Sequence, residues 1–285
     1  MSWIFAGGIL AVAAVFLIII IRDSNRFVKV TYRIQDRKIK KKTRFVLLAD
    51  LHNKEYGKQN EKLLAAIEEV SPDAVLIAGD LITSARNDAE KPAAALLKVL
   101  SDQWPVYYGN GNHEYRVFHQ PENYGNTGAR YRHAVRSTKA CHLEDANVLL
   151  AKENIRIYGL DIPIGFFRKF KEPQLGVREI RKRLGKADRD NFTVLLAHNP
   201  VWFEDYAEWG ADLTLSGHVH GGVVRLPFLG GVLSTSFRLF PKYDGGYFEK
   251  NGRKMIISRG LGAHTIPLRM LNPAELVVLE LLPEE

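Results

Sequence analysis

Five short apolar segments of this sequence each end shortly before an aspartate, an asparagine or a histidine. The residues at these ends are, in chain order, Asp50 and His52, Asp80, Asn112 and His113, His198, and His218 and His220. In an open α/β sheet the carboxyl ends of parallel strands share one edge, where side chains from distant parts of the chain converge. Asp80 follows Asp50 by 30 residues and precedes Asn112 by 32, the length of one strand, helix and strand unit. We therefore expect these residues to meet in one crevice.

The pattern of apolar residues predicts an α/β domain. A strand, helix, strand, helix and strand are predicted, in that order, by 45–49, 63–70, 74–78, 92–100 and 106–108. Later strand candidates lie closer together, between Gly-Gly and Pro turns, which favours hairpins and a mixed sheet. The single cysteine, Cys141, excludes an intramolecular disulfide. With no linker or repeat after residue 42, one domain over 43–285 is the simplest division.

The N-terminus predicts a membrane anchor. Trp3 to Ile21 are 19 residues without a charge, and a helix of that length spans about 28 Å, close to the hydrocarbon thickness of a bilayer. A cleaved signal peptide is disfavoured because no basic residue precedes the apolar run. We expect a transmembrane helix over 1–21 and a basic juxtamembrane segment over 22–42. That segment contains a first half-buried strand, in which the alternating apolar residues are Val28, Val30, Tyr32 and Ile34.

The positive charge is concentrated next to this anchor. Residues 22–44 hold ten basic residues against Asp23 and Asp36, a net of +8, which equals the net charge of the whole chain. A basic collar beside a neutral body fits anionic lipid headgroups better than a nucleic-acid groove, so no nucleic acid is expected as a partner. Because the basic residues follow the span, the positive-inside rule predicts a single-pass membrane protein whose folded domain is cytoplasmic.

The residues at the strand ends have the chemistry of metal ligands. Seven side chains with nitrogen or oxygen donors are more than one divalent ion takes, so two ions bridged by Asp80 are expected, and manganese, iron or zinc would suit such ligands. The two ions would carry a charge of +4 and the two carboxylates only −2, so the centre would be electropositive. Such a centre binds phosphate and lowers the pKa of a bridging water. The resulting hydroxide can attack in line. His113, adjacent to Asn112, is then available to donate a proton to the leaving group.

The motifs and their order resemble the signature of the calcineurin-like metallophosphoesterases. They are Asp50-x-His52, Gly79-Asp80, Gly111-Asn112-His113-Glu114, His198 and Gly217-His218-x-His220. Within the family the chain looks closest to the membrane-associated bacterial members of the YkuE and YaeI type. The resemblance extends from about Phe45 to the C-terminus and implies an α/β/β/α sandwich of two mixed sheets flanked by helices. It also implies that Asp50, His52, Asp80 and His220 hold one metal ion, that Asp80, Asn112, His198 and His218 hold the other, and that His113 assists the leaving group.

Together these features predict a membrane-anchored phosphohydrolase that cleaves a phosphate ester or a pyrophosphate bond. An anchor raises the effective concentration of membrane-resident phosphates, so the favoured hypothesis is a lipid-linked substrate. Arg259, after a late strand candidate, is a candidate phosphate ligand, and a salt-bridged arginine is the alternative. Two other functions stay open: a phosphodiesterase or nuclease, disfavoured by the neutral body, and a metal-binding regulatory protein without activity, disfavoured by the presence of both Asp80 and His113.

Overall fold

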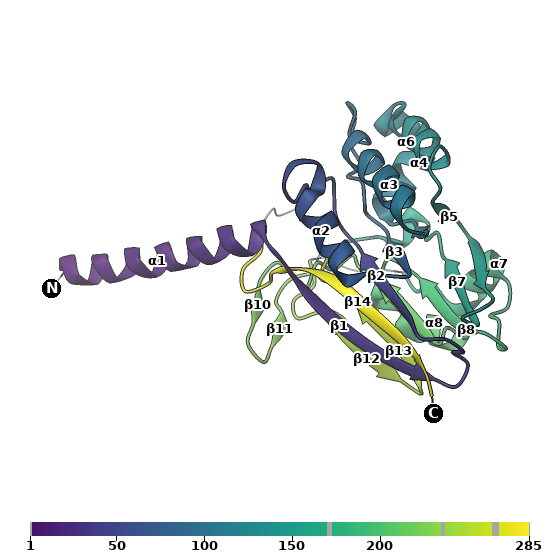
Figure 1. The fold of residues 1–285 in the computed structure, drawn as a ribbon. Helices are drawn as coiled ribbons and strands as arrows, with labels where there is room; N and C mark the ends of the chain where they lie inside the picture. Colours follow the sequence, from purple (N-terminus) through teal and green to yellow (C-terminus); the bar gives the residue numbers. More distant parts are fainter. Residues whose placement is uncertain (1, 170–172, 235–236, 264–267, 285) are drawn as a thin grey trace.

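Two six-stranded mixed sheets lie face to face in the computed structural model, which describes residues 2–169, 173–234, 237–263 and 268–284 (Figure 1). The first sheet has the order β1 (Phe27–Asp36), β14 (Ala274–Pro283), β2 (Thr43–Leu48), β3 (Ala74–Ala78), β4 (Val106–Gly109) and β5 (Cys141–Leu143). The second has the order β12 (Gly246–Lys250), β13 (Arg253–Ile257), β9 (Leu213–Ser216), β8 (Phe192–Leu196), β7 (Ile155–Gly159) and β6 (Ala146–Leu150). The predicted sandwich is confirmed.

Helices cover the outer faces of both sheets. Those over the first sheet are α2 (Glu61–Val70), α3 (Lys91–Gln103), α4 (Asn112–His119), α5 (Pro121–Tyr124) and α6 (Thr127–Arg136), and those over the second are α7 (Val177–Leu184) and α8 (Phe203–Trp209). Short 3-10 turns occur at Lys58–Asn60, Ile164–Phe166 and Pro200–Trp202. Val46 of β2 packs under the helices, whereas Phe45 packs between the sheets. Because both faces of these parallel strands are buried, their sequences are continuous runs of apolar residues.

Helix α1 (Ser2–Asn25) projects from the sandwich, and its described side chains are mostly exposed (Figure 1). Within it, Gly7–Asn25 is long and apolar enough to cross a membrane. The strand predicted after it is β1, the edge strand of the first sheet, which pairs in parallel with β14 from Phe27 to Asp36. The folded body therefore begins at β1 and not at residue 43.

The basic residues of 22–44 do not form one collar beside α1, which corrects that expectation. The ten residues of β1 carry the chain about 33 Å away from the helix. Beyond β1, Lys38 forms an ion pair with Asp212 at 2.8 Å, and Arg44 pairs with Glu280 at 2.9 Å. The segment contains the predicted strand, but cations beyond that strand form ion pairs with the folded body.

Candidate metal centre

The predicted ligands lie at the carboxyl ends of strands from both sheets. Asp50 and His52 follow β2, Asp80 follows β3, Asn112 and His113 begin α4 after β4, His198 follows β8, and His218 and His220 follow β9. Hydrogen bonds join the two edges: the His218 N–H donates to the Asp50 carboxylate at 2.9 Å and the His198 ring nitrogen Nδ1 contacts the Ala78 carbonyl at 2.7 Å. The centre is therefore built between two sheets, where the sequence led us to expect a single edge.

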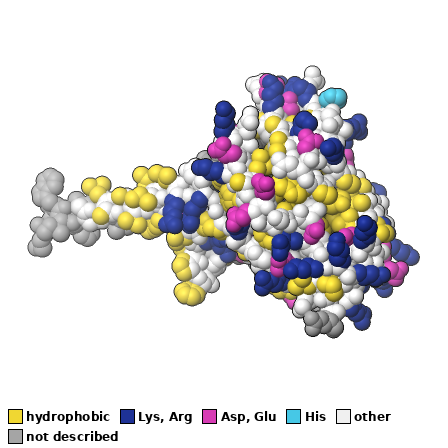
Figure 2. Space-filling view, in the orientation of Figure 1, with side chains coloured by type: hydrophobic (Ala, Val, Ile, Leu, Met, Phe, Trp, Pro, Cys, Tyr) yellow, Lys and Arg dark blue, Asp and Glu magenta, His cyan; other side chains and the backbone are white. Residues whose placement is uncertain are grey.

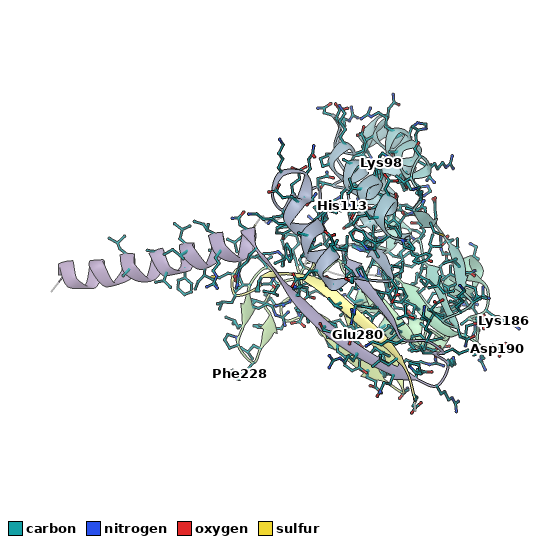
Figure 3. All side chains as sticks on the ribbon, viewed as in Figure 1. Lys98, His113, Lys186, Asp190, Phe228 and Glu280 are labelled. Carbon is teal, nitrogen blue, oxygen red and sulfur yellow. The ribbon has the colours of Figure 1, made fainter. Side chains whose placement is uncertain are left out.

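The donor atoms are close enough to share metal ions. Oδ2 of Asp80 lies 3.0 Å from Nε2 of His198 and 3.8 Å from Nε2 of His52. Oδ1 of Asp50 lies 3.6 Å from Nε2 of His220, which in turn is 3.2 Å from Nε2 of His52. Neighbouring ligand atoms around one ion with bonds of about 2.1 Å are separated by roughly 3 to 3.5 Å. Asp80 belongs to one group with His198 and His218 and to another with His52 and His113, and His113 is labelled in Figure 3.

Three side chains show that the residues fit a metal centre. Oδ1 of Asn112 is buried and has no hydrogen-bond partner among the described residues. Nδ1 of His198 faces the Ala78 carbonyl, and Nδ1 of His220 faces the Gly262 carbonyl at 3.3 Å. A carbonyl only accepts, so both rings carry a proton on Nδ1, and Nε2 is the nitrogen that faces the centre as a possible metal ligand.

His113 has the opposite tautomer. Its Nδ1 accepts a hydrogen bond of 2.8 Å from the backbone N–H of Ser84. Because a backbone N–H can only donate, the proton of the neutral ring lies on Nε2. That nitrogen is 3.9 Å from Oδ2 of Asp80. His113 therefore directs an N–H group towards the centre, whereas His198 and His220 keep a proton on the nitrogen that faces away from it.

The ligand loops have an unusual backbone. The described residues with positive φ include Asp50, His52, Asp80, His218 and His220, with φ between 51° and 72°. Left-handed conformations are uncommon for residues with a side chain and persist where the surrounding structure holds them. A Cβ added to Gly111 would lie 2.2 Å from Oδ1 of Asp80, so only glycine allows this approach. The candidate ligands are thus held in a backbone conformation that the surrounding structure must stabilise.

Burial and mutual charge shift the pKa values of these groups in opposite directions. Burial raises the pKa of Asp50 to about 7. Burial alone would lower the pKa of His198, but the Asp80 and Asp50 carboxylates raise it to about 10. Burial, and then the charge of His198, lower the pKa of His218 to about 3. Such clusters of perturbed groups are typical of functional sites.

Two buried charged residues hold the ligand loops, and the sequence analysis assigned no role to either. Glu114 accepts hydrogen bonds from the backbone N–H groups of Leu81 at 2.9 Å and Gly111 at 2.9 Å. Arg269 donates to the carbonyls of Gly260 at 3.1 Å and Gly262. Neither sits in a periodic pattern, and the only signal for Glu114 was its place directly after His113.

Arg259 does not stand free at the centre. Its Nε pairs with Oε2 of Glu275 at 2.7 Å, and its backbone N–H donates to Oε1 of the same carboxylate at 2.8 Å. The salt-bridged alternative therefore describes the arginine.

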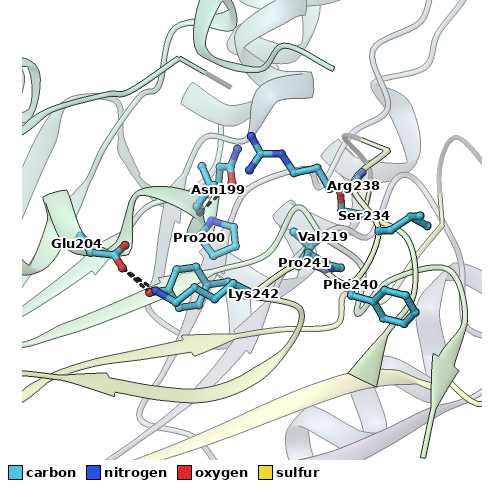
Figure 4. A pocket seen from close by; sticks show the side chains of 12 residues that line it. Asn199, Pro200, Glu204, Val219, Ser234, Arg238, Phe240, Pro241 and Lys242 are labelled. Carbon is cyan, nitrogen blue, oxygen red and sulfur yellow. Dashed lines mark hydrogen bonds and ion pairs between the residues drawn. The ribbon is translucent and has the colours of Figure 1, made fainter. Parts of the chain in front are cut away.

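A cavity of about 380 Å³ is lined by residues that neighbour the candidate ligands in the sequence (Figure 4). Its wall includes Asn199, which follows His198, and Val219, which lies between His218 and His220. Other lining residues are Pro200, Glu204, Arg238, Phe240, Lys242 and Tyr243. The volume lies within the range of small-molecule pockets, and the lining is mainly apolar with a few polar groups. The arrangement thus offers space beside the metal ligands.

Another group of possible ligands, His119, Glu144 and Asp161, shares no residue with the groups around Asp50 and Asp80. Its acidic members already have partners: Asp161 accepts from Asn110 at 3.0 Å, and Glu144 pairs with Arg132. Burial raises the pKa of Asp161 to about 7.

Comparison with known proteins agrees with the geometry. Residues 43–222 match the profile described as Calcineurin-like phosphoesterase. The chain is 31% identical to an uncharacterized metallophosphoesterase of Helicobacter pylori strain J99, over 87% of this chain and 62% of that protein. It is 25% identical to the uncharacterized metallophosphoesterase YkuE of Bacillus subtilis, over 84% of this chain and 78% of that protein. A Danio rerio protein named a transmembrane protein with metallophosphoesterase domain is 24% identical, over 82% of this chain and 52% of that protein. The chain thus spans about 60% of the length of some of these relatives.

Proposed function

The chain belongs to the calcineurin-like phosphoesterase family, and from that membership we propose that it hydrolyses a phosphate ester or a phosphoanhydride with two divalent metal ions. The observation that carries the proposal is the meeting of carboxylate and imidazole donors around Asp50 and Asp80, beside the buried, unpartnered Oδ1 of Asn112. One ion would be held by Asp50, His52, Asp80 and His220, and the other by Asp80, Asn112, His198 and His218. When bound, the ions would supply Lewis-acid activation of water and neutralise the phosphoryl oxygens.

The chain's own residues then bind and orient the substrate and move a proton. His113 would donate its Nε2 proton to the leaving oxygen, because the Ser84 N–H keeps the ring in that tautomer. The cavity lined by Asn199 and Val219 would receive the part of the substrate beyond the phosphate. The Nε of Arg259 is paired with Glu275, so only the remaining nitrogens of its guanidinium would be able to bind the phosphate.

The test measures metal content, para-nitrophenol release from the two esters and phosphate release from pyrophosphate, on the purified full chain. The substrates are para-nitrophenyl phosphate, its bis ester and inorganic pyrophosphate, each with manganese, iron or zinc. Asp80→Asn should lose both metal and turnover, whereas Asp161→Asn, at a similarly buried aspartate that is not among the candidate ligands, should keep both. Full turnover by Asp80→Asn would contradict the proposal. Turnover of the bis ester alone would identify a phosphodiesterase, and metal binding without turnover of any ester would favour a regulatory protein.

We further propose that α1 anchors the chain in a membrane, with the folded body cytoplasmic, and that the substrate is a lipid-linked phosphate or pyrophosphate. Hydrogen bonds that connect the last turn of α1 to a ligand loop support this. The backbone N–H of Asn272 donates to Asp23 at 3.1 Å, and the Asn272 side chain donates to the His220 carbonyl at 2.7 Å. A helix that crosses the bilayer would therefore hold the centre close to the headgroups.

This part of the proposal is tested by removing the helix alone. A chain beginning at Arg22 keeps Asp23 and the whole of β1. Its turnover of a lipid phosphate in vesicles should fall much more than its turnover of para-nitrophenyl phosphate. An equal loss on both substrates, or no loss, would contradict a membrane-resident substrate.

A further inference from the structure

The hairpin formed by β10 (Arg225–Leu226) and β11 (Gly230–Gly231) ends in an uncovered apolar turn. Phe228 at its tip is fully exposed, Leu229 is 65% exposed and Leu226 is 36% exposed. Single exposed apolar residues are normal on a protein surface. Successive ones at a projecting tip are not, and they mark a contact with another apolar phase. We call residues 226–229 the apolar tip.

The hairpin and the end of α1 are attached to the same short segment, Arg269–Asn272. At the hairpin base, the Arg225 N–H donates to the Met270 carbonyl at 3.1 Å. On the helix side, the Arg269 N–H donates to the Ser24 hydroxyl at 3.2 Å. Leu271, between these bonds, is itself 41% exposed. The apolar tip is therefore linked to the place where α1 leaves the body.

In Figures 1 and 2 the hairpin and α1 lie at the same end of the folded body. The hairpin projects from the end of the body from which α1 extends, and some basic side chains lie near the base of α1 on the face shown. Figure 3 labels Phe228 at the outer end of the hairpin, pointing away from the sheets. A bilayer crossed by α1 would have its headgroups beside this end of the body.

We propose that the apolar tip, with Leu271, inserts into the interface of the membrane that α1 crosses, which makes the hairpin a second lipid contact. The inference rests on the proposed anchoring by α1. A bilayer is the occupant that this position favours, because phenylalanine and leucine partition into the boundary between headgroups and acyl chains. The tip itself carries no charge, and Arg22 and Arg26 at the end of α1 suit anionic headgroups.

The contact would orient the metal centre, because the hairpin is tied to a ligand loop. The Arg225 side chain donates to the Gly221 carbonyl at 2.8 Å, one residue after the ligand His220. The Asn272 side chain donates to the carbonyls of both His220 and Gly222. A helix alone leaves the body free to rotate about the helix axis, whereas two lipid contacts define which face meets the membrane. The cavity and the centre would then keep one orientation towards membrane-resident phosphates.

The test places a fluorescent probe at the tip of the full chain. Phe228→Cys, in a Cys141→Ala background, is labelled with an environment-sensitive dye and inserted into phosphatidylcholine and phosphatidylglycerol vesicles. Some of the lipids carry a nitroxide near the top of the acyl chain. Interfacial residues lie about 5–10 Å deep, so the nitroxide should quench roughly half of the emission. Leu149→Cys on β6, which is 39% exposed, is the matched control and should not be quenched.

A probe on the helix separates this inference from the anchoring. Ile18→Cys, at a residue that is 63% exposed, should be quenched by lipids that carry the nitroxide deep in the acyl chain. Quenching at 18 without quenching at 228 overturns the second contact and leaves the anchor. Quenching at 228 alone supports the contact and overturns the anchor, and quenching at neither position overturns both. A blue shift at 228 that depends on protein concentration, without quenching, identifies a second copy of the chain as the occupant and overturns the lipid contact.

Discussion

Glu114 holds the backbone of Asp80: its Oε2 accepts the Asp80 N–H at 2.8 Å. The same carboxylate accepts a hydrogen bond of 2.7 Å from the hydroxyl of Tyr108. Glu114 and Asp80 are 34 residues apart in the sequence. Asp80 keeps its positive φ because this buried acceptor takes up the N–H groups of the turn. Glu114 is therefore a positioning residue for the carboxylate that would bridge the two metal ions.

Replacing Glu114 with glutamine tests this role. The amide group would face backbone N–H donors, and at least one buried N–H would lose its acceptor, at a cost of about 3 kcal/mol in the free energy of unfolding. Chemical denaturation measures the stability, and elemental analysis should show reduced metal content. Glu122→Gln, at an exposed residue of α5, should change the stability by less than about 0.5 kcal/mol. Equal stability of the two variants would remove the role assigned to Glu114.

His113→Ala should lower turnover while leaving metal content nearly intact. The lost contribution is that of a general acid, which is typically about 10²–10⁴-fold. His133→Ala, at an exposed histidine of α6, should keep turnover. If His113→Ala loses as much metal as Asp80→Asn, then His113 is a ligand and the proton must come from another group.

Arg269→Lys should destabilise the loop that supports Asp50. The guanidinium donates to several carbonyls at once, and the Gly262 N–H donates to the Asp50 carbonyl at 2.6 Å. A lysine cannot match that planar set of donors, so a loss of about 2 kcal/mol is expected, with weaker binding of the metal held by Asp50 and His220. Arg136→Lys, at an exposed arginine, is the control. Unchanged stability and two bound metals in Arg269→Lys would contradict the expectation.

The stability of the metal-saturated protein should depend on pH through Asp161. The pKa of this carboxyl rises from 3.8 to about 7, mainly because of burial. The folded state therefore binds the proton more tightly than the unfolded state between about pH 4 and pH 7, so stability falls as the pH rises through that window, by up to about 1.4 kcal/mol per pH unit.

Asp161→Asn should flatten this dependence, as followed by denaturation midpoints from pH 4.5 to pH 7.5. Asp190→Asn, at an exposed aspartate, should keep the dependence of the parent protein. Parallel curves for the parent and Asp161→Asn would show that the proton is bound elsewhere.

Much of the architecture is readable in the sequence because buried parallel strands leave continuous apolar runs. The run at 74–78 coincides with β3, and the run at 45–49 overlaps β2. The positions of Asp50 and Asp80 followed from the end of each run, since the carboxyl ends of such strands are brought together by the crossover helices.

The parts that could not be predicted depend on contacts between distant residues. β5 is three residues long and leaves no periodic pattern. The bonds of Glu114 and Arg269 go to backbone groups, which are identical in every residue and so carry no sequence signal. The basic residues of 22–44 were misplaced because the alternation of β1 identifies a strand but not the edge to which it pairs.

The hydrogen bond from His218 to Asp50 connects residues 168 positions apart. Contacts of such sequence separation form after local structure, since the entropy of closing the intervening chain opposes them. A chain emerging from the ribosome would complete β2, β3 and β4 with four of the seven candidate ligands made, and would complete the candidate metal centre only after β9 is made and the second sheet docks on the first. The order of synthesis thus delays hydrolytic competence until the whole sandwich has formed.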